Sequence, residues 1–143
     1  MVKYMADYIK KIEFVFYYED VIREMVQEAR NKIAASEVRN ASRVSDPTAA
    51  AAIRNITPVE YVIINSQRLH KPERWLEVID NTRSWCIAQG GKISSILRER
   101  YGGKKNSQVC KELDIDANYF YRALDKIRNY AALWAARFQL ISF

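Results

Sequence analysis

The segment from Ser107 to Arg128, SQVCKELDIDANYFYRALDKIR, limits the possible folds of this chain more than any other segment. Its apolar residues recur at helical spacing in two short runs with a polar break between them. They are Val109, Cys110 and Leu113 in the first run, Ile115 in the break, and Phe120, Ala123, Leu124 and Ile127 in the second run. We therefore predict two short helices, each with one buried side, joined by a tight turn.

Two aspartates mark the predicted turn. Asp116 stands where an N-cap belongs, because its carboxylate can accept from the free backbone N–H groups of Asn118 or Tyr119 at the positive end of the helix dipole. The second helix should then begin at Ala117. Asp114 stands where helix-turn-helix motifs often have Gly, and Asp adopts the left-handed conformation less readily than Gly but more readily than most residues. Two antiparallel helices of an ordinary bundle remain the alternative.

The outward side of the second helix is polar, aromatic and cationic. Its residues are Ala117, Asn118, Tyr119, Tyr121, Arg122, Asp125 and Lys126. Such a side suits the major groove of double-stranded DNA, where Asn bonds an adenine edge, Arg a guanine edge, and Lys or a Tyr hydroxyl a phosphate. Because the first turns of a recognition helix contribute most, we predict that Asn118, Tyr121 and Arg122 read bases.

The positive charge of the chain is concentrated around this segment. From Lys92 to the end there are ten Lys and Arg against five Asp and Glu, which accounts for +5 of the overall net charge of +6. Cations beside a helix-turn-helix motif give affinity for the phosphate backbone without reading sequence. The alternative is a solvated charged loop. The predicted backbone contacts are Arg98, Arg100, Lys104, Lys105, Ser107, Gln108, Tyr119 and Lys126.

The fold class follows from length and from what the pattern lacks. The 143 residues include only four Gly and three Pro, and no alternating strand pattern is flanked by hairpin turns. We predict an all-α protein with a long N-terminal amphipathic helix and a helical bundle that ends in a helix-turn-helix domain. The predicted parts are helix 1–36, linker 37–46, helical segment 47–91 with starts at Pro47, at Thr57-Pro58 and after Pro72, and helix-turn-helix domain 92–143 with an apolar C-terminal helix.

Two apolar surfaces predict contacts beyond the motif. The N-terminal residues Ile12, Val15, Ile22, Val26 and Ile33 repeat at spacings typical of a coiled-coil seam, interrupted by Glu19. A homodimer contact and an intramolecular bundle fit this seam equally well. The tail that contains Trp134 and Phe138 is so apolar that it must be buried in its own core or against another subunit. We expect a homo-oligomer that uses these residues.

Several classes of function are disfavoured. No stretch approaches the roughly 20 apolar residues that span a bilayer, and no signal-peptide core is present, so we expect a cytoplasmic protein without a membrane partner. Cys86 and Cys110 are isolated, with only His70 as a third soft ligand, which favours buried reduced thiols over a metal site. The chain lacks a glycine-rich phosphate loop, an HExxH pair and a nucleophile elbow. We expect neither enzymatic activity nor a cofactor.

Three segments resemble the ArpU/RinA-type family of bacteriophage late-gene regulators. They are SDPTAAAAIRN at 45–55, RWLEVID at 74–80, and the helix-turn-helix segment, which is similar to region four of sigma factors. The resemblance implies a transcription activator that binds a promoter-proximal site through Asn118, Tyr121 and Arg122. A contact with RNA polymerase is a further hypothesis beyond this resemblance. Two alternatives stay open: a small terminase-like subunit that recognises phage DNA for packaging, and a helical protein-interaction adaptor without DNA binding.

Overall fold

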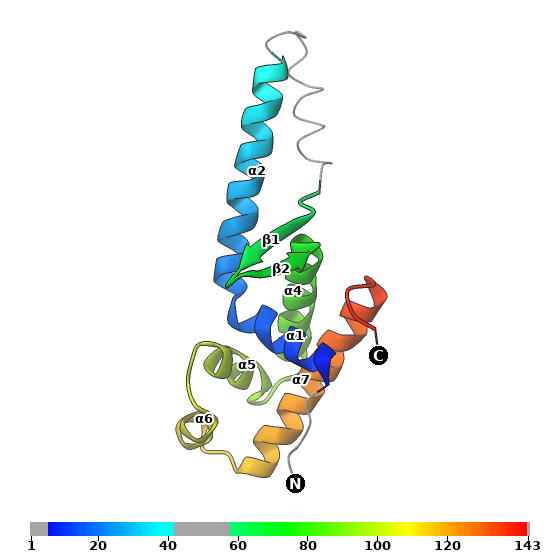
Figure 1. Cartoon of the computed structure of the whole chain (residues 1–143). Helices are drawn as coiled ribbons and strands as arrows, with labels where there is room; N and C mark the ends of the chain where they lie inside the picture. The colour runs from blue at the N-terminus through cyan, green and yellow to red at the C-terminus, as the bar shows by residue number, and fades with distance from the viewer. Residues whose placement is uncertain (1–5, 42–57, 143) are drawn as a thin grey trace. The chain divides into compact units, whose positions relative to one another are not determined.

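The computed structural model describes residues 6–41 and 58–142 and is mainly helical there, as predicted (Figure 1). The described elements are α1 Asp7–Tyr17, α2 Glu19–Ala41, β1 Tyr61–Ile64, β2 Gln67–His70, α4 Pro72–Gln89, α5 Ile93–Tyr101, α6 Asn106–Leu113 and α7 Ala117–Arg137. The chain divides into two compact units, Met1–Glu19 with Glu77–Phe143, and Asp20–Leu76. The candidate site lies in the first unit.

Helix α7 is the central element of the first unit, because it contacts α1, α5 and α6. Apolar residues from all four helices are buried, among them Ile12, Val15, Ile96, Val109 and Phe120, each with no exposed surface. The stacked rings of Trp85 and Tyr130 link α4 to α7 with centroids 4.6 Å apart. The unit therefore has its own hydrophobic core, and the helix-turn-helix segment is part of it.

The N-terminal region is not one helix, so that prediction is wrong. Helix α1 ends at Tyr17, the N–H of Tyr18 donates to the carbonyl of Phe14 at 3.0 Å, and α2 starts at Glu19. The aromatic run that ends α1 packs onto Tyr101 of α5, with ring centroids 5.1 Å away for Phe16 and 5.0 Å away for Tyr17. Helix α2 continues to Ala41, so 37–41 of the predicted linker is helical; 42–46 and the helix predicted from Pro47 lie outside the described residues.

The predicted homodimer seam is buried within a single chain. Ile12, Val15 and Ile22 are fully buried, Val26 is 7% exposed, and Ile33 is half-buried. Side chains that are already covered by their own chain have no apolar surface left for a partner. The burial of Ile12, Val15, Ile22 and Val26 therefore favours the intramolecular alternative for these four residues, whereas the role of Ile33 and the oligomeric state stay predictions.

A β-hairpin stands where a helix was predicted from Thr57-Pro58. Strands β1 and β2 pair antiparallel, with Tyr61 opposite His70 and Ile64 opposite Gln67. Val62 and Ile64 are buried while Tyr61 and Ile63 are exposed, which is the alternation of a half-buried strand. The two-residue turn has positive φ at Asn65 (50°) and Ser66 (65°), as a type I′ turn requires. The β-branched run YVII and this turn together favour the hairpin over the helix start that was predicted at Thr57-Pro58.

Helix α4 follows the hairpin and starts at Pro72, next to the helix start that the sequence predicted after this residue. Pro72 does end the preceding element, and it stands at the first position of α4, where its missing N–H costs nothing. The helix ends at Gln89, followed by Gly90 and Gly91 at φ of 72° and 61°, the left-handed conformation expected at a helix C-terminus.

Candidate nucleic-acid interface

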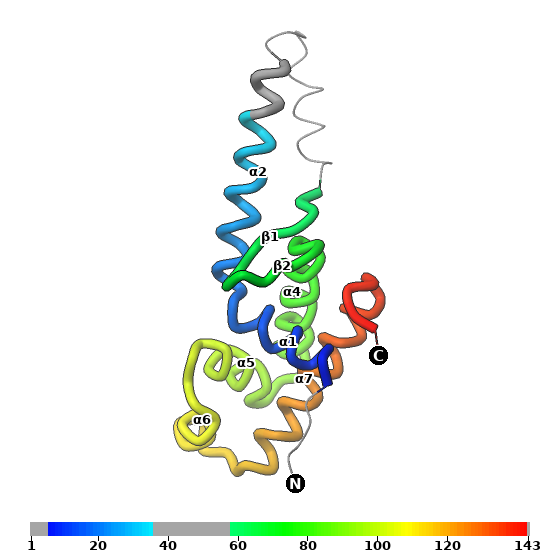
Figure 2. Tube along the Cα trace, viewed as in Figure 1, coloured from blue at the N-terminus to red at the C-terminus, as the bar shows by residue number. Residues whose placement is uncertain are grey.

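Backbone hydrogen bonds close the turn between α6 and α7. Figure 2 shows the path of the chain through this turn. The backbone of Asp114 has the left-handed helical conformation, with φ 52° and ψ 54°. Its N–H donates to the carbonyl of Lys111 at 3.3 Å, and the N–H of Ile115 donates to the carbonyl of Cys110 at 3.0 Å. This pair of hydrogen bonds is a Schellman motif, which satisfies the last carbonyls of α6. Asp114 thus fills the position that glycine often has.

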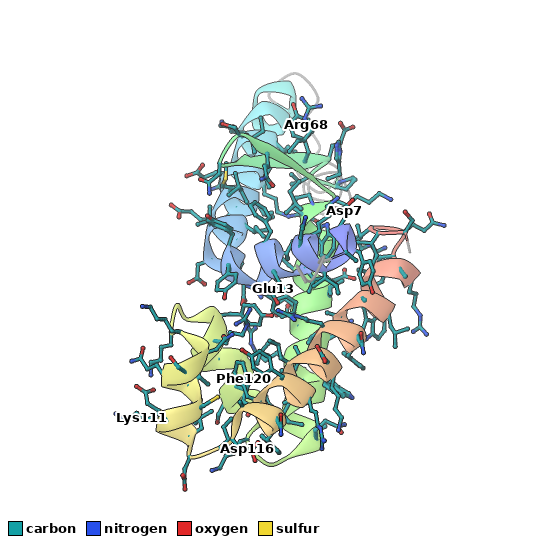
Figure 3. All side chains as sticks on the ribbon, turned by 60° about the horizontal axis from the view of Figure 1, so that its bottom comes forward. Asp7, Glu13, Arg68, Lys111, Asp116 and Phe120 are labelled. Atoms are coloured by element: carbon teal, nitrogen blue, oxygen red, sulfur yellow. The ribbon has the colours of Figure 1, made fainter. Side chains whose placement is uncertain are left out.

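The start of α7 is capped as the sequence predicted. The N–H of Tyr119 donates to the carboxylate of Asp116 at 2.7 Å, and the helix begins at Ala117. The inward residues are buried, with 0% exposure for Phe120 and 1% for Leu124. Figure 3 shows Asp116 at the turn and Phe120 among the surrounding helices. A local cap and a buried inner side therefore fix the first turns of α7 in place.

The opposite side of these turns is open to solvent. Every residue predicted to point outward is exposed, and we call this set the outer face of α7: Ala117, Asn118, Tyr119, Tyr121, Arg122, Asp125 and Lys126. Tyr121 is 52% exposed, yet its ring rests edge-on against Phe120, with centroids 5.2 Å apart. Within the described part of the chain, neither Arg122 nor Lys126 is in an ion pair. Their charges remain available to an anionic partner.

The predicted base readers lie on one stripe of this face. Asn118, Tyr121 and Arg122 are spaced i, i+3 and i+4, so their side chains are neighbours on the helix surface. Tyr119, predicted to contact the backbone, is 41% exposed and reaches toward the loop before α5, where a Cβ added at Gly91 would stand 3.5 Å from its hydroxyl. The structure therefore brings the three predicted base readers together and leaves Tyr119 at their flank.

Most of the predicted backbone contacts are exposed, but they differ in how free their charges are. Arg98, Lys105, Ser107 and Gln108 are exposed, although Arg98 lies 3.2 Å from Glu99 and Gln108 donates to Glu112 at 3.2 Å. Lys104 lies between two carboxylates, 2.6 Å from Glu99 and 2.5 Å from Glu112. Its hydrogen bonds hold the pKa of both carboxyls below the ordinary value. The two carboxylates therefore offset the positive charge of Lys104, which weakens its attraction for a phosphate.

Arg100 does not belong to the interface, which corrects the prediction for this residue. Its side chain is only 11% exposed, and Nη2 donates to Oε2 of Glu13 at 3.0 Å. Its Nη1 donates to Oδ1 of Asn106, the first residue of α6. A guanidinium with these partners is turned into the protein. Its place beside the motif in the sequence did not reveal this, because the partner carboxylate comes from α1.

Glu13 is the residue that the sequence did not single out. Its Oε1 accepts from the hydroxyl of Tyr101 at 2.7 Å and from Nε of Arg128 at 2.6 Å. We call Glu13, Arg100, Tyr101 and Arg128 the Glu13 cluster; Figure 3 labels Glu13 on α1. The available signal was an acid next to Ile12 on the apolar side of α1.

The charges of the Glu13 cluster determine its protonation. Burial alone would raise the pKa of Glu13, but the hydrogen bonds from Tyr101 and Arg128 and the charges of the two arginines outweigh it and hold the pKa below its ordinary value. Burial, together with the charge of Glu13, raises the pKa of Tyr101. The carboxylate is therefore ionised and the phenol keeps the proton that it donates.

The sequence did not single out Lys92, in the loop before α5, or Lys111, on α6. Nζ of Lys92 donates to the carbonyl of Leu113, which places a cation at the negative end of α6. Lys111 is exposed on α6, and Figure 3 shows it on the outer side of that helix. Lys92 therefore stabilises the end of the helix, and Lys111 adds a solvated cation near the motif.

Two aromatic residues of the C-terminal tail, Trp134 and Phe138, are half-buried and contact each other with ring centroids 5.5 Å apart. Their role in oligomerisation stays a prediction.

The two cysteines differ in burial. Cys86 is buried, which raises the pKa of its thiol to about 11, and Cys110 is half-buried. Among residues 6–41 and 58–142, no three His, Cys, Asp or Glu side chains are grouped to hold a metal. None of the helices in these two ranges combines the length and the apolar character of a membrane span.

Comparison with known proteins gives no match for this chain. No protein-family model, no curated protein and no solved structure matches it. The resemblance to late-gene regulators and the identity of the base readers therefore stay predictions. What the chain does has to be inferred from the chemistry of its own residues.

Proposed function

We propose that this chain binds double-stranded DNA in a sequence-specific way, with the outer face of α7 in the major groove, and regulates transcription. The observation that supports this most is the stripe of Asn118, Tyr121 and Arg122 on the first turns of a capped helix. Asn can bond an adenine edge with two hydrogen bonds, and Arg can do the same with guanine. Tyr121 adds a phenol whose ring is held against the buried Phe120.

The exposed cations suggest how the DNA backbone is held. Lys105 and Ser107 lie at the N-terminus of α6, where free backbone N–H groups and the helix dipole favour a phosphate. Lys126 lies one turn beyond Arg122 and would reach the other side of the groove. We propose these residues, with Lys111, as the phosphate contacts, and we exclude Arg100 and Lys104 because carboxylates already neutralise them.

The test begins with selection of bound sequences from a random DNA library. Fluorescence anisotropy then compares the selected site with scrambled DNA over a range of salt concentrations. Arg122→Ala should weaken the selected site far more than scrambled DNA, whereas Lys126→Ala should weaken both alike and reduce the salt slope by about 1. Lys104→Ala is the matched control and should leave the salt slope unchanged. If the wild-type chain binds no DNA at low salt, the proposal is wrong and the adaptor alternative gains support.

Regulation is tested separately from binding. The selected sequence is placed near a promoter, and transcription by a bacterial RNA polymerase is measured with the wild-type chain and with Arg122→Ala. We expect the wild-type chain to change the transcript level and the variant to change it much less. If the wild-type chain binds the site but leaves transcription unchanged, the regulatory part of the proposal is wrong, and recognition of DNA for packaging is favoured.

A further inference from the structure

The Glu13 cluster gathers an unusual amount of charge inside the first unit. Glu13 is 12% exposed and lies beside Ile12 and Val15, which are fully buried. A carboxylate in such surroundings is costly unless it is ionised and fully hydrogen-bonded. Here one carboxylate accepts three hydrogen bonds, from Arg100, Tyr101 and Arg128. These donors come from α5 and α7, so a single side chain of α1 connects both helices.

The connections continue into both halves of the helix-turn-helix motif. Arg100 holds Glu13 with one terminal nitrogen and Asn106, the first residue of α6, with the other. Arg128 belongs to α7 and follows Arg122 by six residues, about 9 Å along the helix. Glu13 is thus joined to α6 through Arg100 and to α7 through Arg128.

Removal of the charge on Glu13 would turn this attraction into repulsion. Arg100 and Arg128 are 11% and 15% exposed, so water screens them little. Nε of Arg100 is buried and donates no hydrogen bond to the described residues, and the guanidinium also lies over the rings of Tyr17 and Tyr101. Without Glu13 it would have no carboxylate partner among the described residues to balance its charge. Two uncompensated cations would push α5, and with it the start of α6, away from α7.

We propose that Glu13 is a positioning residue for DNA recognition: it sets α6 against α7, so that phosphate contacts from α6 and base contacts from α7 are made together. This inference rests on the proposed function. Non-specific binding needs only the cations, whereas specific binding needs both helices in register. Loss of the Glu13 charge should therefore reduce specific binding more than non-specific binding.

The experiment compares Glu13→Gln with Val15→Ala, a neighbouring buried change on α1 that alters no charge. Both variants are studied at a temperature where urea titrations show each to be folded. Hydrogen exchange is measured first, without DNA. Glu13→Gln should speed exchange of amides in α6 and in the first turns of α7, and Val15→Ala should do so much less. Equal exchange in these segments for the two variants would overturn the inference, whether or not DNA is bound.

The ratio of affinities for selected and scrambled DNA is measured next. Glu13→Gln should lower this ratio about tenfold, whereas Val15→Ala should leave it unchanged. Replacing Arg128 as well, in Glu13→Gln/Arg128→Gln, removes one of the two repelling charges and should slow the exchange of α6 again. If the wild-type chain shows no preference for any sequence, the proposed function fails, and the exchange data still decide whether Glu13 positions α6 and α7. An unchanged ratio in Glu13→Gln, with a preference in the wild type, refutes the role in recognition.

Discussion

The outer face of α7 and the Glu13 cluster both contain arginines from the last third of the chain. These arginines differ in their exposure to solvent and in whether a carboxylate pairs with them. Arg122 is exposed and in no ion pair with the described residues, whereas Arg100 and Arg128 are 11% and 15% exposed and both contact Glu13. Lys104 resembles the second group, because two carboxylates neutralise it. The net charge of a segment therefore overstates what a phosphate backbone would meet. The carboxylates that the fold brings nearby decide which cations remain free.

The two regions should respond to different measurements. A change in the Glu13 cluster exposes an unpaired charge inside the protein, so its main cost falls on the free energy of unfolding. A change on the outer face removes a solvated side chain, so its main cost falls on binding.

Arg128→Ala should lower the free energy of unfolding by about 3 kcal/mol, the low end for breaking a buried pair, because Glu13 keeps Arg100 and Tyr101. Urea titration followed by tryptophan fluorescence measures this loss. Lys126→Ala, on the outer face of the same helix, is the control and should change the stability by no more than about 0.5 kcal/mol. Equal stabilities for the two variants would mean that the Glu13 cluster contributes nothing to holding α7.

Asn118→Ala should leave stability nearly unchanged and cost about 2 kcal/mol of base discrimination, roughly thirtyfold, at one position of the selected site. The measurement is anisotropy against a panel of sites that each differ from the selected sequence by one base pair. We expect the loss at a single adenine-containing pair, because Asn offers one donor and one acceptor to that base. A uniform loss of affinity over the whole panel would indicate that Asn118 contacts the DNA backbone and does not read a base.

The sequence was sufficient for the motif because its determinants are local. The buried positions Phe120 and Leu124 follow from helical spacing, and the cap at Asp116 needs only the next three residues. The hairpin was locally encoded too, by YVII and the Asn65-Ser66 turn, but a capping signal at Thr57-Pro58 competed with it. Here pairing between strands outweighed the helix start signal, and periodicity alone does not rank those two effects.

The Glu13 cluster could not be predicted in the same way. Glu13 and Arg128 are separated by 115 positions, and nothing in the pattern around either residue identifies the other. The break at Tyr18 has a similar origin, since the aromatic residues before it pack on Tyr101, far along the chain. Without these contacts the sequence assigned Arg100 to DNA and left the N-terminal seam open between a homodimer contact and an intramolecular bundle. The partner of Arg100, Glu13, comes close to it only in the tertiary structure.

Asp116→Ala tests how far the outer face depends on its local support. Loss of the cap should lower the free energy of unfolding by about 1 kcal/mol, because the N–H of Tyr119 loses its acceptor. Fraying of the first turn should also weaken binding to the selected site, since Asn118 lies in that turn. Asp116→Ser keeps a hydrogen-bond acceptor at this position, so it should retain most of the free energy of unfolding and most of the affinity for the selected site. If Asp116→Ala lowers stability as much as Arg128→Ala, local support and the long-range cluster are not separable.

The smallest expected effect is a gain at the turn itself. Asp114 is left-handed, and a side chain in that conformation costs roughly 1–2 kcal/mol, somewhat less for Asp. Asp114→Gly removes this strain but gives the unfolded chain more freedom, which costs roughly 0.5–1 kcal/mol. The net should be a stabilisation of about 0.5 kcal/mol in urea titration, with no change in sequence preference. Asp114→Val, a β-branched residue at the same positive φ, should destabilise instead. A loss of stability in Asp114→Gly would mean that the carboxylate of Asp114 contributes more to the turn than its backbone strain removes.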